Sequence, residues 1–428
     1  MDDLIYFFSF QDPNVVFVVL GISFLSVSAA MVGTFTFLDK KALIGDAISH
    51  AVLPGVCLAF MFAGTKNPYW IVAGAFTTGA LATYAISWIS KETKLKEDTV
   101  IASVLSVFFG VGIVFMTKLQ QTGNAALSGL DHFLFGNAIS IVGEDILVYG
   151  TLALITIFTL LIFYKEFKVM IFNREFAVSV GLPVRRMEFI FNSLMVLAVV
   201  TGIQAIGVVL MAALLITPVA AARFWTDRLG KMLLFSVLIA LFSGIAGAYI
   251  SFTLPNMPTG PWVVVVLSLF AFFSFFFSHK KGLITRWYSK RAYQRKIHAD
   301  HILKKLFYAD ENETQPMTLQ DIQSDFPGQN AKTLTSVNTL RNKDYIITKQ
   351  DVIHLTDKGL SEAKRIIRSH RLWELYLTEY INIDPDHVHD TADKMEHILT
   401  PEIEAKLDAY LNYPSTDPHQ SIIPRDKP

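Results

Sequence analysis

The chain has 428 residues, of which 52% are hydrophobic and only 17% are charged, and its mean hydropathy is +0.42. Soluble globular proteins carry about 25% charged residues, so this composition excludes an ordinary soluble enzyme, and it is too apolar for a disordered chain. The 37 basic and 37 acidic residues balance to a formal net charge of zero, and the single cysteine, Cys57, excludes a disulfide framework within the chain.

Charged residues are distributed unevenly, which predicts two regions. Residues 289–428 contain 19 Lys and Arg, 22 Asp and Glu, and eight of the eleven His. Residues 1–288 contain the remaining 18 basic and 15 acidic residues. We therefore expect an apolar domain in residues 1–288 and a polar, histidine-rich domain in residues 289–428.

Nine apolar runs in residues 1–288 are each near the roughly 20 residues that a helix needs to cross a bilayer. They cover residues 14–37, 42–64, 67–90, 98–117, 143–164, 187–204, 206–225, 232–253 and 261–278. Lipid offers the backbone no hydrogen-bond partners, so spans of this kind are helices. The sequence thus predicts an all-α polytopic membrane domain of about nine transmembrane helices.

Basic residues alternate between loops, which sets the expected orientation. The loops after the first, third, fifth, seventh and ninth runs are rich in Lys and Arg, whereas the opposite loops contain only Lys66 and Lys118. Because basic loops stay in the cytoplasm, the N-terminus is expected outside and the polar domain inside. We expect a multi-pass protein of the cell membrane, embedded in lipid. Its N-terminus, Met1-Asp2-Asp3, lacks the basic region of a cleaved signal peptide.

An acidic residue and a histidine lie in the second apolar run, where polar groups are candidates for function. Asp46 and His50 are four residues apart, so both point to one side of a helix. A carboxylate and an imidazole form half a site for a divalent transition metal. Alternatively, Asp46 caps the helix and His50 binds a backbone carbonyl. Pro54 and Gly55 predict a bend or break nearby, a feature common at transport sites.

The loop between the fifth and sixth runs contains a short apolar and polar segment at residues 172–183. Gly181 and Pro183 are typical of a helix end, so the segment predicts a short amphipathic helix on the cytoplasmic side. It is either a plain connection or a docking helix for a cytoplasmic partner.

The order of predicted elements in the polar domain is that of a winged helix. A basic helix is expected at about 288–309, a capped helix from 318 and a second helix at 329–340. A hairpin at 345–355 and a long helix from 356 follow. A winged helix binds DNA or protein. The candidate DNA contacts are Lys332, Ser336, Asn338 and Arg341, although the net charge of −3 is not a strong DNA footprint.

Histidine and carboxylate residues recur at helical spacing towards the C-terminus. His370 and Glu374 are four residues apart, and His389, Asp393, Glu396 and His397 follow one another at 0, +4, +7 and +8, so one helix would present all four on one face. Three imidazoles and three carboxylates suit divalent manganese, iron or zinc. The alternative is a solvated polar face with ordinary salt bridges.

Residues 10–280 resemble the permease subunits of metal-ion ABC importers, which take up manganese, zinc or iron. The resemblance rests on residues 45–55, on the loop from Glu175 to Gly181, and on residues 207–214, Pro218 and 220–223. It implies a second permease copy or paralogue, an external metal-binding protein and a cytoplasmic ATPase. It also implies that Asp46 and His50 bind the metal in the pathway, and that the loop with Glu175, Ala177 and Gly181 couples to the ATPase.

ATP hydrolysis is not expected in this chain, because Gly-x-x-x-x-Gly-Lys-[Ser/Thr] does not occur in it. The chain is therefore predicted to be a transport permease rather than an enzyme. A divalent metal is expected as cargo and as a ligand of the polar domain, and no organic cofactor is expected.

Residues 295–425 resemble the diphtheria-toxin-repressor family of metal-dependent regulators. Residues 369–377, 388–397 and 417–424 carry the resemblance. It implies one metal site at His370, Glu374 and His389, and most of a second at Asp393, Glu396 and His397. The sequence departs from the family at the first helix, where His301 or Lys304 stands in place of an acidic ligand.

Together these features predict an importer permease for a divalent metal with a fused cytoplasmic, metal-responsive domain. That domain would inhibit the pump when metal is plentiful or, cut free, act as a repressor. One alternative is a membrane-tethered metal-dependent transcription regulator, for which Asp46 and the coupling loop would be unnecessary. Another is a permease for a metal chelate, which the acid and imidazole pair suits less well than a naked ion.

Overall fold

The computed structural model describes residues 2–63, 68–121, 143–254, 257–311, 317–397 and 399–424. The chain divides into two compact units, Met1–Thr285 and Arg286–Pro428, which we call the membrane unit and the tail unit. The predicted boundary, after residue 288, lies three residues further along the chain.

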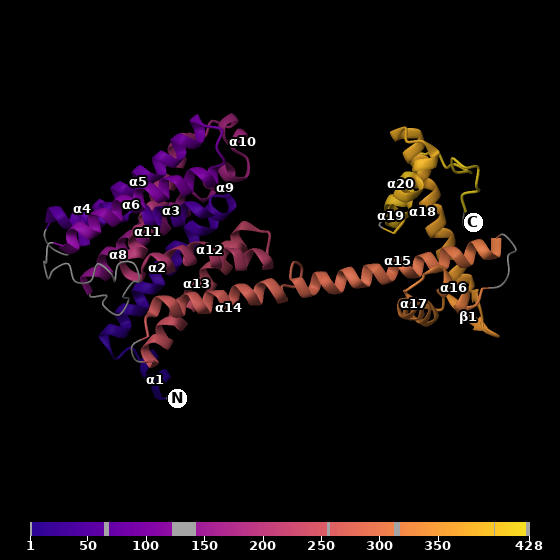
Figure 1. The fold of residues 1–428 in the computed structure, drawn as a ribbon, viewed down its shortest axis with the longest axis horizontal. Helices are drawn as coiled ribbons and strands as arrows, with labels where there is room; N and C mark the ends of the chain where they lie inside the picture. The colour runs from indigo at the N-terminus through magenta and orange to yellow at the C-terminus, as the bar shows by residue number, and fades with distance from the viewer. Residues whose placement is uncertain are drawn as a thin grey trace. The chain divides into compact units, whose positions relative to one another are not determined.

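Helices make up the regular structure of the membrane unit in the described residues (Figure 1). They are α1 (Asp2–Phe8), α2 (Pro13–Leu38), α3 (Ala42–Ala51), α4 (Leu53–Ala63), α5 (Pro68–Glu92), α6 (Glu97–Gln121), α8 (Gly143–Ile162), α9 (Tyr164–Phe172), α10 (Arg174–Ser179), α11 (Val184–Ile206), α12 (Val208–Trp225), α13 (Leu229–Thr253) and α14 (Thr259–Phe277).

The predicted count of nine spans is not confirmed. Among the described residues, seven helices are long and apolar enough to cross a membrane, or eight if the bent pair α8 and α9 is counted as one span. The predicted span 206–225 falls on α12, of which the described stretch Leu210–Trp225 is a shorter apolar helix. Gly207, whose φ is +85°, separates α11 from α12, so the 18-residue helix α12 begins two residues after the start of the predicted span.

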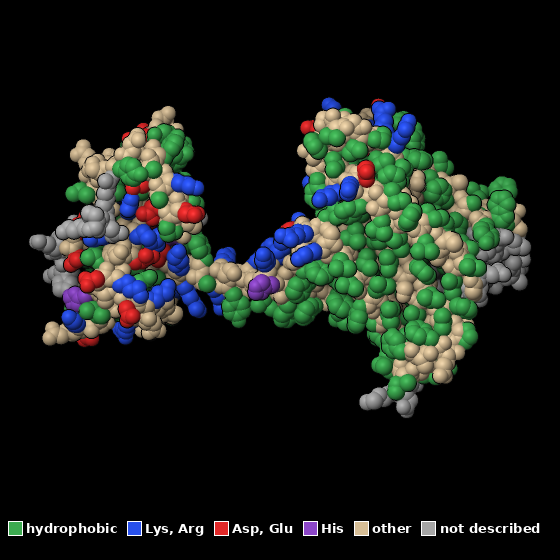
Figure 2. All heavy atoms as spheres, turned by 180° about the vertical axis from the view of Figure 1, so that it is seen from behind, with side chains coloured by type: hydrophobic (Ala, Val, Ile, Leu, Met, Phe, Trp, Pro, Cys, Tyr) green, Lys and Arg blue, Asp and Glu red, His purple; other side chains and the backbone are tan. Residues whose placement is uncertain are grey.

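Helix α2 lies at the centre of the membrane unit, where it packs against α8, α12 and α13. Its buried face includes Ile22, Leu25 and Phe35, each at most 2% exposed. Hydrophobic side chains also cover much of the outer face of this unit (Figure 2). An apolar exterior around an apolar core is what a lipid environment requires.

Helices α3 and α4 together form the span Leu43–Ala63, interrupted only at Val52. Backbone hydrogen bonds from Val52 to Ile48 and from Val56 to Val52 continue across the interruption. The break expected near Pro54 is therefore a small one.

The first half of the tail unit has the predicted winged-helix order. It comprises α15 (Leu283–Glu311), which begins just before the unit boundary, then α16 (Leu319–Asp325), α17 (Asn330–Asn342), β1 (Ile346–Lys349), β2 (Val352–Leu355) and α18 (Asp357–Ile381). Thr318 and Asp321 form a capping box at α16. The two strands pair antiparallel, with Ile346 opposite Leu355.

Helix α18 connects two hydrophobic cores of the tail unit. Its first half packs Ile366 and Ile367 with residues of α15, α17 and the hairpin. Its second half contributes Leu372 and Leu375 to a smaller core. The chain then continues through the 3₁₀ turn η3 (Pro385–His387), α19 (His389–Met395) and α20 (Pro401–Tyr410). This arrangement brings α15, α18 and α19 to one place.

Candidate metal centres

The polar pair of the membrane unit lies on α3, as the spacing predicts. His50 Nε2 is 3.7 Å from Asp46 Oδ1, and the two side chains are 29% and 43% exposed. The His50 ring packs edge-on against Phe109 of α6, with ring centroids 5.1 Å apart. The other ring nitrogen, Nδ1, is buried and has no hydrogen-bond partner among the described residues. The pair is thus accessible on one side and supported by apolar packing on the other.

The predicted amphipathic segment forms α10. Asn173 caps it by accepting a hydrogen bond from the Phe176 N–H at 2.9 Å, and the φ of +83° at Gly181 ends the turn after it. Ala177 is fully buried, whereas Phe176 is 54% exposed. Glu175 is also exposed. A short helix with an exposed aromatic side chain in a connecting loop can dock onto a partner.

Of the candidate DNA contacts on α17, one is corrected by the structure. Ser336 is 2% exposed, because it lies on the side of α17 that packs into the tail core, so it cannot reach a DNA surface. Lys332 is half-buried and donates to Gln329 Oε1 at 3.1 Å. Asn338 and Arg341 are exposed, and Arg341 donates to Thr348 Oγ1 of β1 at 3.0 Å.

The first group of possible ligands in the tail joins α18 to α19. His370 Nε2 is 3.1 Å from Glu374 Oε1 and 3.3 Å from His389 Nδ1. His389 Nδ1 also contacts Glu374 Oε1. His370 and Glu374 are buried, whereas the His389 side chain is 69% exposed. Two imidazoles and a carboxylate thus converge close to the surface, where an ion has access.

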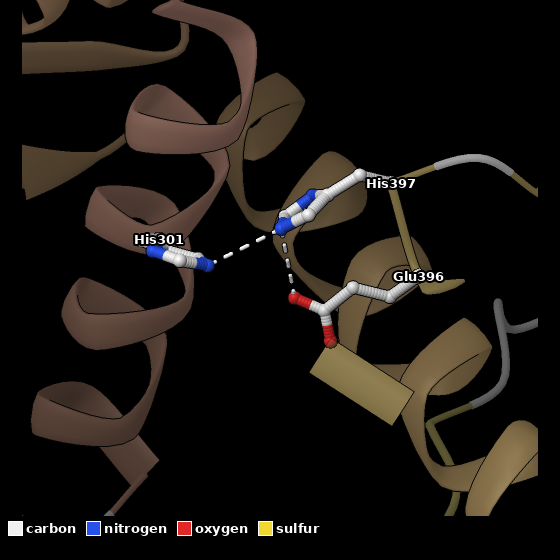
Figure 3. A group of neighbouring side chains, drawn as sticks. All are labelled: His301, Glu396 and His397. Carbon is white, nitrogen blue, oxygen red and sulfur yellow. Dashed lines mark hydrogen bonds and ion pairs between the residues drawn. The ribbon is translucent and has the colours of Figure 1, made fainter. Parts of the chain in front are cut away.

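A second group joins α15 to the residues after α19 (Figure 3). His397 Nε2 is 3.2 Å from His301 Nε2 and 3.6 Å from Glu396 Oε1. His397 Nδ1 is 3.0 Å from Asp300 Oδ2, so that carboxylate can hold the proton on Nδ1 and leave Nε2 free to bind a metal. Glu396 Oε1 is buried and has no hydrogen-bond partner in the part of the chain that the structure describes.

Lys304 of α15 lies in the middle of a third group. Its ammonium donates to Asp393 Oδ1 at 2.9 Å and to Glu396 Oε2 at 3.1 Å, and it lies 3.2 Å from His370 Nδ1. His370 Nδ1 is itself 2.6 Å from Glu396 Oε2 and 3.3 Å from Asp393 Oδ1. The Lys304 side chain is 15% exposed and that of Glu396 is fully buried.

The protonation states follow from this packing. Burial, with His397 adding to it, lowers the pKa of His301 and favours the neutral ring that a metal ligand requires. Burial disfavours a charge on Lys304, but the neighbouring Glu396 and Asp393 raise its pKa, so it stays an ammonium. Burial likewise opposes a charged Asp393, yet the hydrogen bond from Lys304 keeps its pKa below the ordinary value.

The six tail residues predicted as ligands come together, but not on one helical face. Helix α19 ends at Met395, so Glu396 and His397 follow it. His397 lies beside His301 of α15, Glu396 lies between α15 and His370 of α18, and His389 lies beside α18. The contact of Asp300 with His397 was not predicted from the sequence. Its only sequence signal is its place next to His301, because the packing of α15 against residues 396–397 cannot be read from spacing.

Two of the three groups fit a divalent metal by donor chemistry. His370, Glu374 and His389, and likewise His301, Glu396 and His397, each offer two imidazoles and a carboxylate, and the orphaned Glu396 Oε1 favours a cation beside it. The group of His370, Asp393 and Glu396 does not fit a divalent metal while Lys304 lies among these residues, because the Lys304 ammonium takes the place of the ion.

Comparisons with known proteins agree with the division of the chain into a membrane unit and a tail unit. The profile of the ABC 3 transport family matches residues 11–278, and that of the iron dependent repressor, metal binding and dimerisation domain matches residues 356–425. The manganese transport system membrane protein MntC of Bacillus subtilis is 35% identical over 408 residues, which cover 94% of each chain and so include both units. The zinc transport system membrane protein TroC of Treponema pallidum is 36% identical over 282 residues, 66% of this chain and 95% of that one.

Among solved structures, PsaBC from Streptococcus pneumoniae in complex with Fab matches with a TM-score of 0.58 and 27% identity, over 67% of this chain and 99% of that chain. The helical arrangement of the membrane unit is therefore shared with that structure. The chain belongs to the ABC 3 transport family and carries an iron-dependent-repressor domain at its C-terminal end.

Proposed function

We propose that this chain is the permease subunit of an ATP-driven importer of a divalent transition metal, namely manganese, zinc or iron. Membership of a transport family supports it, as do relatives named for manganese and zinc transport. The observation that carries the proposal is the Asp46 and His50 pair within the span Leu43–Ala63. An ionisable pair inside a membrane span is costly unless it serves a pathway.

The geometry of this pair suits a transient ion site. The 3.7 Å separation leaves the two ligand atoms close enough to bind one ion without a tight bond between them. Two protein ligands hold an ion weakly compared with the four of a structural site, and a transported ion must leave again. Backbone carbonyls, water or a second copy of the chain would complete its coordination.

The partners follow from the same proposal. A separate cytoplasmic ATPase docks on α10, whose exposed Phe176 and Val178 supply an apolar contact. The ion pair between Arg174 and Glu188, at 2.6 Å, ties α10 to α11 and can pass a movement of the ATPase into the membrane unit. An external metal-binding protein delivers the ion, and a second permease copy or paralogue completes the pathway.

The tail is proposed as a metal-responsive regulatory domain. The support is the convergence of α15, α18 and α19 on two groups of ligands that suit manganese, iron or zinc. Its ligands come from separate elements, so a bound ion would draw these elements together, and the tail would report the metal level in the cytoplasm.

The test is cellular accumulation of manganese, zinc and iron when the chain is co-expressed with its ATPase and its external binding protein. The variants are Asp46→Ala and His50→Ala, and the control is Asp39→Ala, whose carboxylate pairs with Lys41 outside the span. We expect both pathway variants to lose accumulation of the same metal, which names the cargo. Equal accumulation by all four proteins, each present in the membrane, would overturn the proposal.

A separate test addresses the tail. In the full-length chain, His397→Ala removes one ligand of the group formed by His301, Glu396 and His397 and leaves the membrane unit unchanged. If the tail inhibits uptake when metal is plentiful, this variant keeps importing at external metal levels that slow the wild type. If high external metal slows uptake equally in both proteins, inhibition through His301, Glu396 and His397 is excluded.

A further inference from the structure

The side chain of Lys304 occupies the position that a metal ion would take among Asp393, Glu396 and His370. Three of its neighbours within 3.2 Å are potential metal ligands, and a buried carboxylate is one of them. Surface lysines seldom hold such a position, because their ammonium groups remain solvated. Here the side chain crosses from α15 to the segment that follows α18.

This third group also shares residues with the other two. His370 uses Nδ1 toward Lys304 and Glu396 but Nε2 toward Glu374 and His389. Glu396 uses Oε2 toward Lys304 but Oε1 toward His397. The contacts of Lys304 therefore restrain one ligand of each group that fits a metal.

We propose that Lys304 is a built-in competitor of the divalent ion in the tail, so that a metal ion recruits Asp393 and the Oε2 atom of Glu396 only above a threshold that this ammonium sets. The inference rests on the proposed metal binding of the tail and adds the residue that sets its sensitivity. At low metal, Lys304 neutralises Asp393 and Glu396 and keeps α15 attached to them. A metal ion that recruits Asp393 or the Oε2 atom of Glu396 must displace it.

The competition follows from charge and space. An ammonium and a divalent ion cannot both lie about 3 Å from the same carboxylate oxygens, because their repulsion in a partly buried site is large. An ion at His370, Glu374 and His389 leaves Lys304 in place, whereas an ion that takes Asp393 ejects it. Removal of the ammonium charge is therefore expected to tighten metal binding by about tenfold or more.

The direct test needs no substitution at Lys304. The full-length chain, carrying Asp46→Ala to weaken the pathway site, is treated with an amine-acylating reagent with and without Mn²⁺, and each lysine is quantified by mass spectrometry. Lys305 is the matched control, because it is the next residue, pairs with Asp325 and lies outside the cluster. We expect Mn²⁺ to increase acylation of Lys304 several-fold and to leave Lys305 unchanged. Unchanged acylation of Lys304 at Mn²⁺ concentrations that saturate every site of the tail would overturn the inference.

Equilibrium binding of Mn²⁺ to the same full-length background gives the second measurement. Lys304→Gln should bind Mn²⁺ about tenfold more tightly than the parent or bind one further ion, whereas Lys304→Arg and Lys305→Gln should match the parent. A Lys304→Gln isotherm that coincides with that of a metal-binding parent overturns the role of Lys304 but leaves metal binding by the tail intact. An absence of tail-bound Mn²⁺ in every variant overturns both proposals.

Discussion

Glu396→Gln is the most informative change in the tail, because Glu396 belongs to two of the three ligand groups. The substitution keeps the shape of the side chain and removes its charge. In the protein without metal, Glu396 Oε2 receives a hydrogen bond from Lys304 at 3.1 Å and lies 2.6 Å from His370 Nδ1, and the side chain is fully buried. A hydrogen bond to a charged group contributes about 1.5–3 kcal/mol.

The variant therefore loses the charge component of two such contacts and leaves Lys304 with Asp393 as its one remaining carboxylate partner in the cluster. We expect the free energy of opening of the tail unit to fall by about 3 kcal/mol, which is also the lower end of the cost of breaking a buried ion pair. The assay is hydrogen exchange with mass spectrometry on the full-length chain in a chelator. Peptides from α18 and from residues 389–397 should exchange faster.

The control is Glu402→Gln, an exposed glutamate in the first turn of α20. A surface change of this kind should alter stability by less than about 0.5 kcal/mol. Equal protection of α18 in the two variants would refute the reasoning, since it would mean that Glu396 and Lys304 do not form a stabilising pair in the folded chain.

Three further changes test separate parts of the structure by hydrogen exchange. Gly181 has a φ of +83°, and nothing lies within 4 Å of an added Cβ, so Gly181→Ala should lower local stability by about 1 kcal/mol through backbone strain alone and speed exchange in residues 172–183. Unchanged exchange there would show that the turn does not need glycine. Burial, together with Lys332 and His301, lowers the pKa of His298, so the contribution of His298 to stability is complete above pH 6.5 and is lost as the pH falls through its folded pKa. Helices α15 and α17 should therefore open more easily at pH 5.5 than at pH 7.5. The variant His298→Gln, which can keep a hydrogen bond to Thr333, should show a smaller pH effect. Thr318→Ala removes the capping box of α16 and should cost about 1 kcal/mol, so equal protection of α16 in variant and parent would contradict the capping contribution.

Local signals in the sequence predicted local structure well. The Thr318 cap, the hairpin around residues 345–355 and the joint placement of Asp46 and His50 on α3 follow from spacing and residue type, and the structure has each of them. The count of spans was not predictable in the same way. The gap predicted at residue 205 lies close to Gly207, which separates α11 from α12, but composition does not show the 67° bend between α8 and α9.

The tail ligands show the same limit. The i and i+4 pair of His370 and Glu374 was visible in the sequence because both lie on one helix. The second group depends on α15 lying against the residues after α19, which are almost 100 positions away, so Asp300 was not predicted as a partner of His397. Lys304 was recognised only as a departure from a carboxylate. Its position among three ligands required the structure.

ATP-dependent uptake of Mn²⁺ into proteoliposomes that contain the chain with its ATPase and external binding protein tests the central claim most directly. The comparison is wild type against Asp46→Ala. The pair that Asp46 makes is partly exposed and 3.7 Å long, so its loss should cost no more than about 1 kcal/mol of stability, and the variant should remain folded. The account predicts uptake by the wild type and at least about a tenfold loss in the folded variant, since one of two protein ligands is gone. Uptake by Asp46→Ala at the wild-type rate would contradict a metal pathway through this pair.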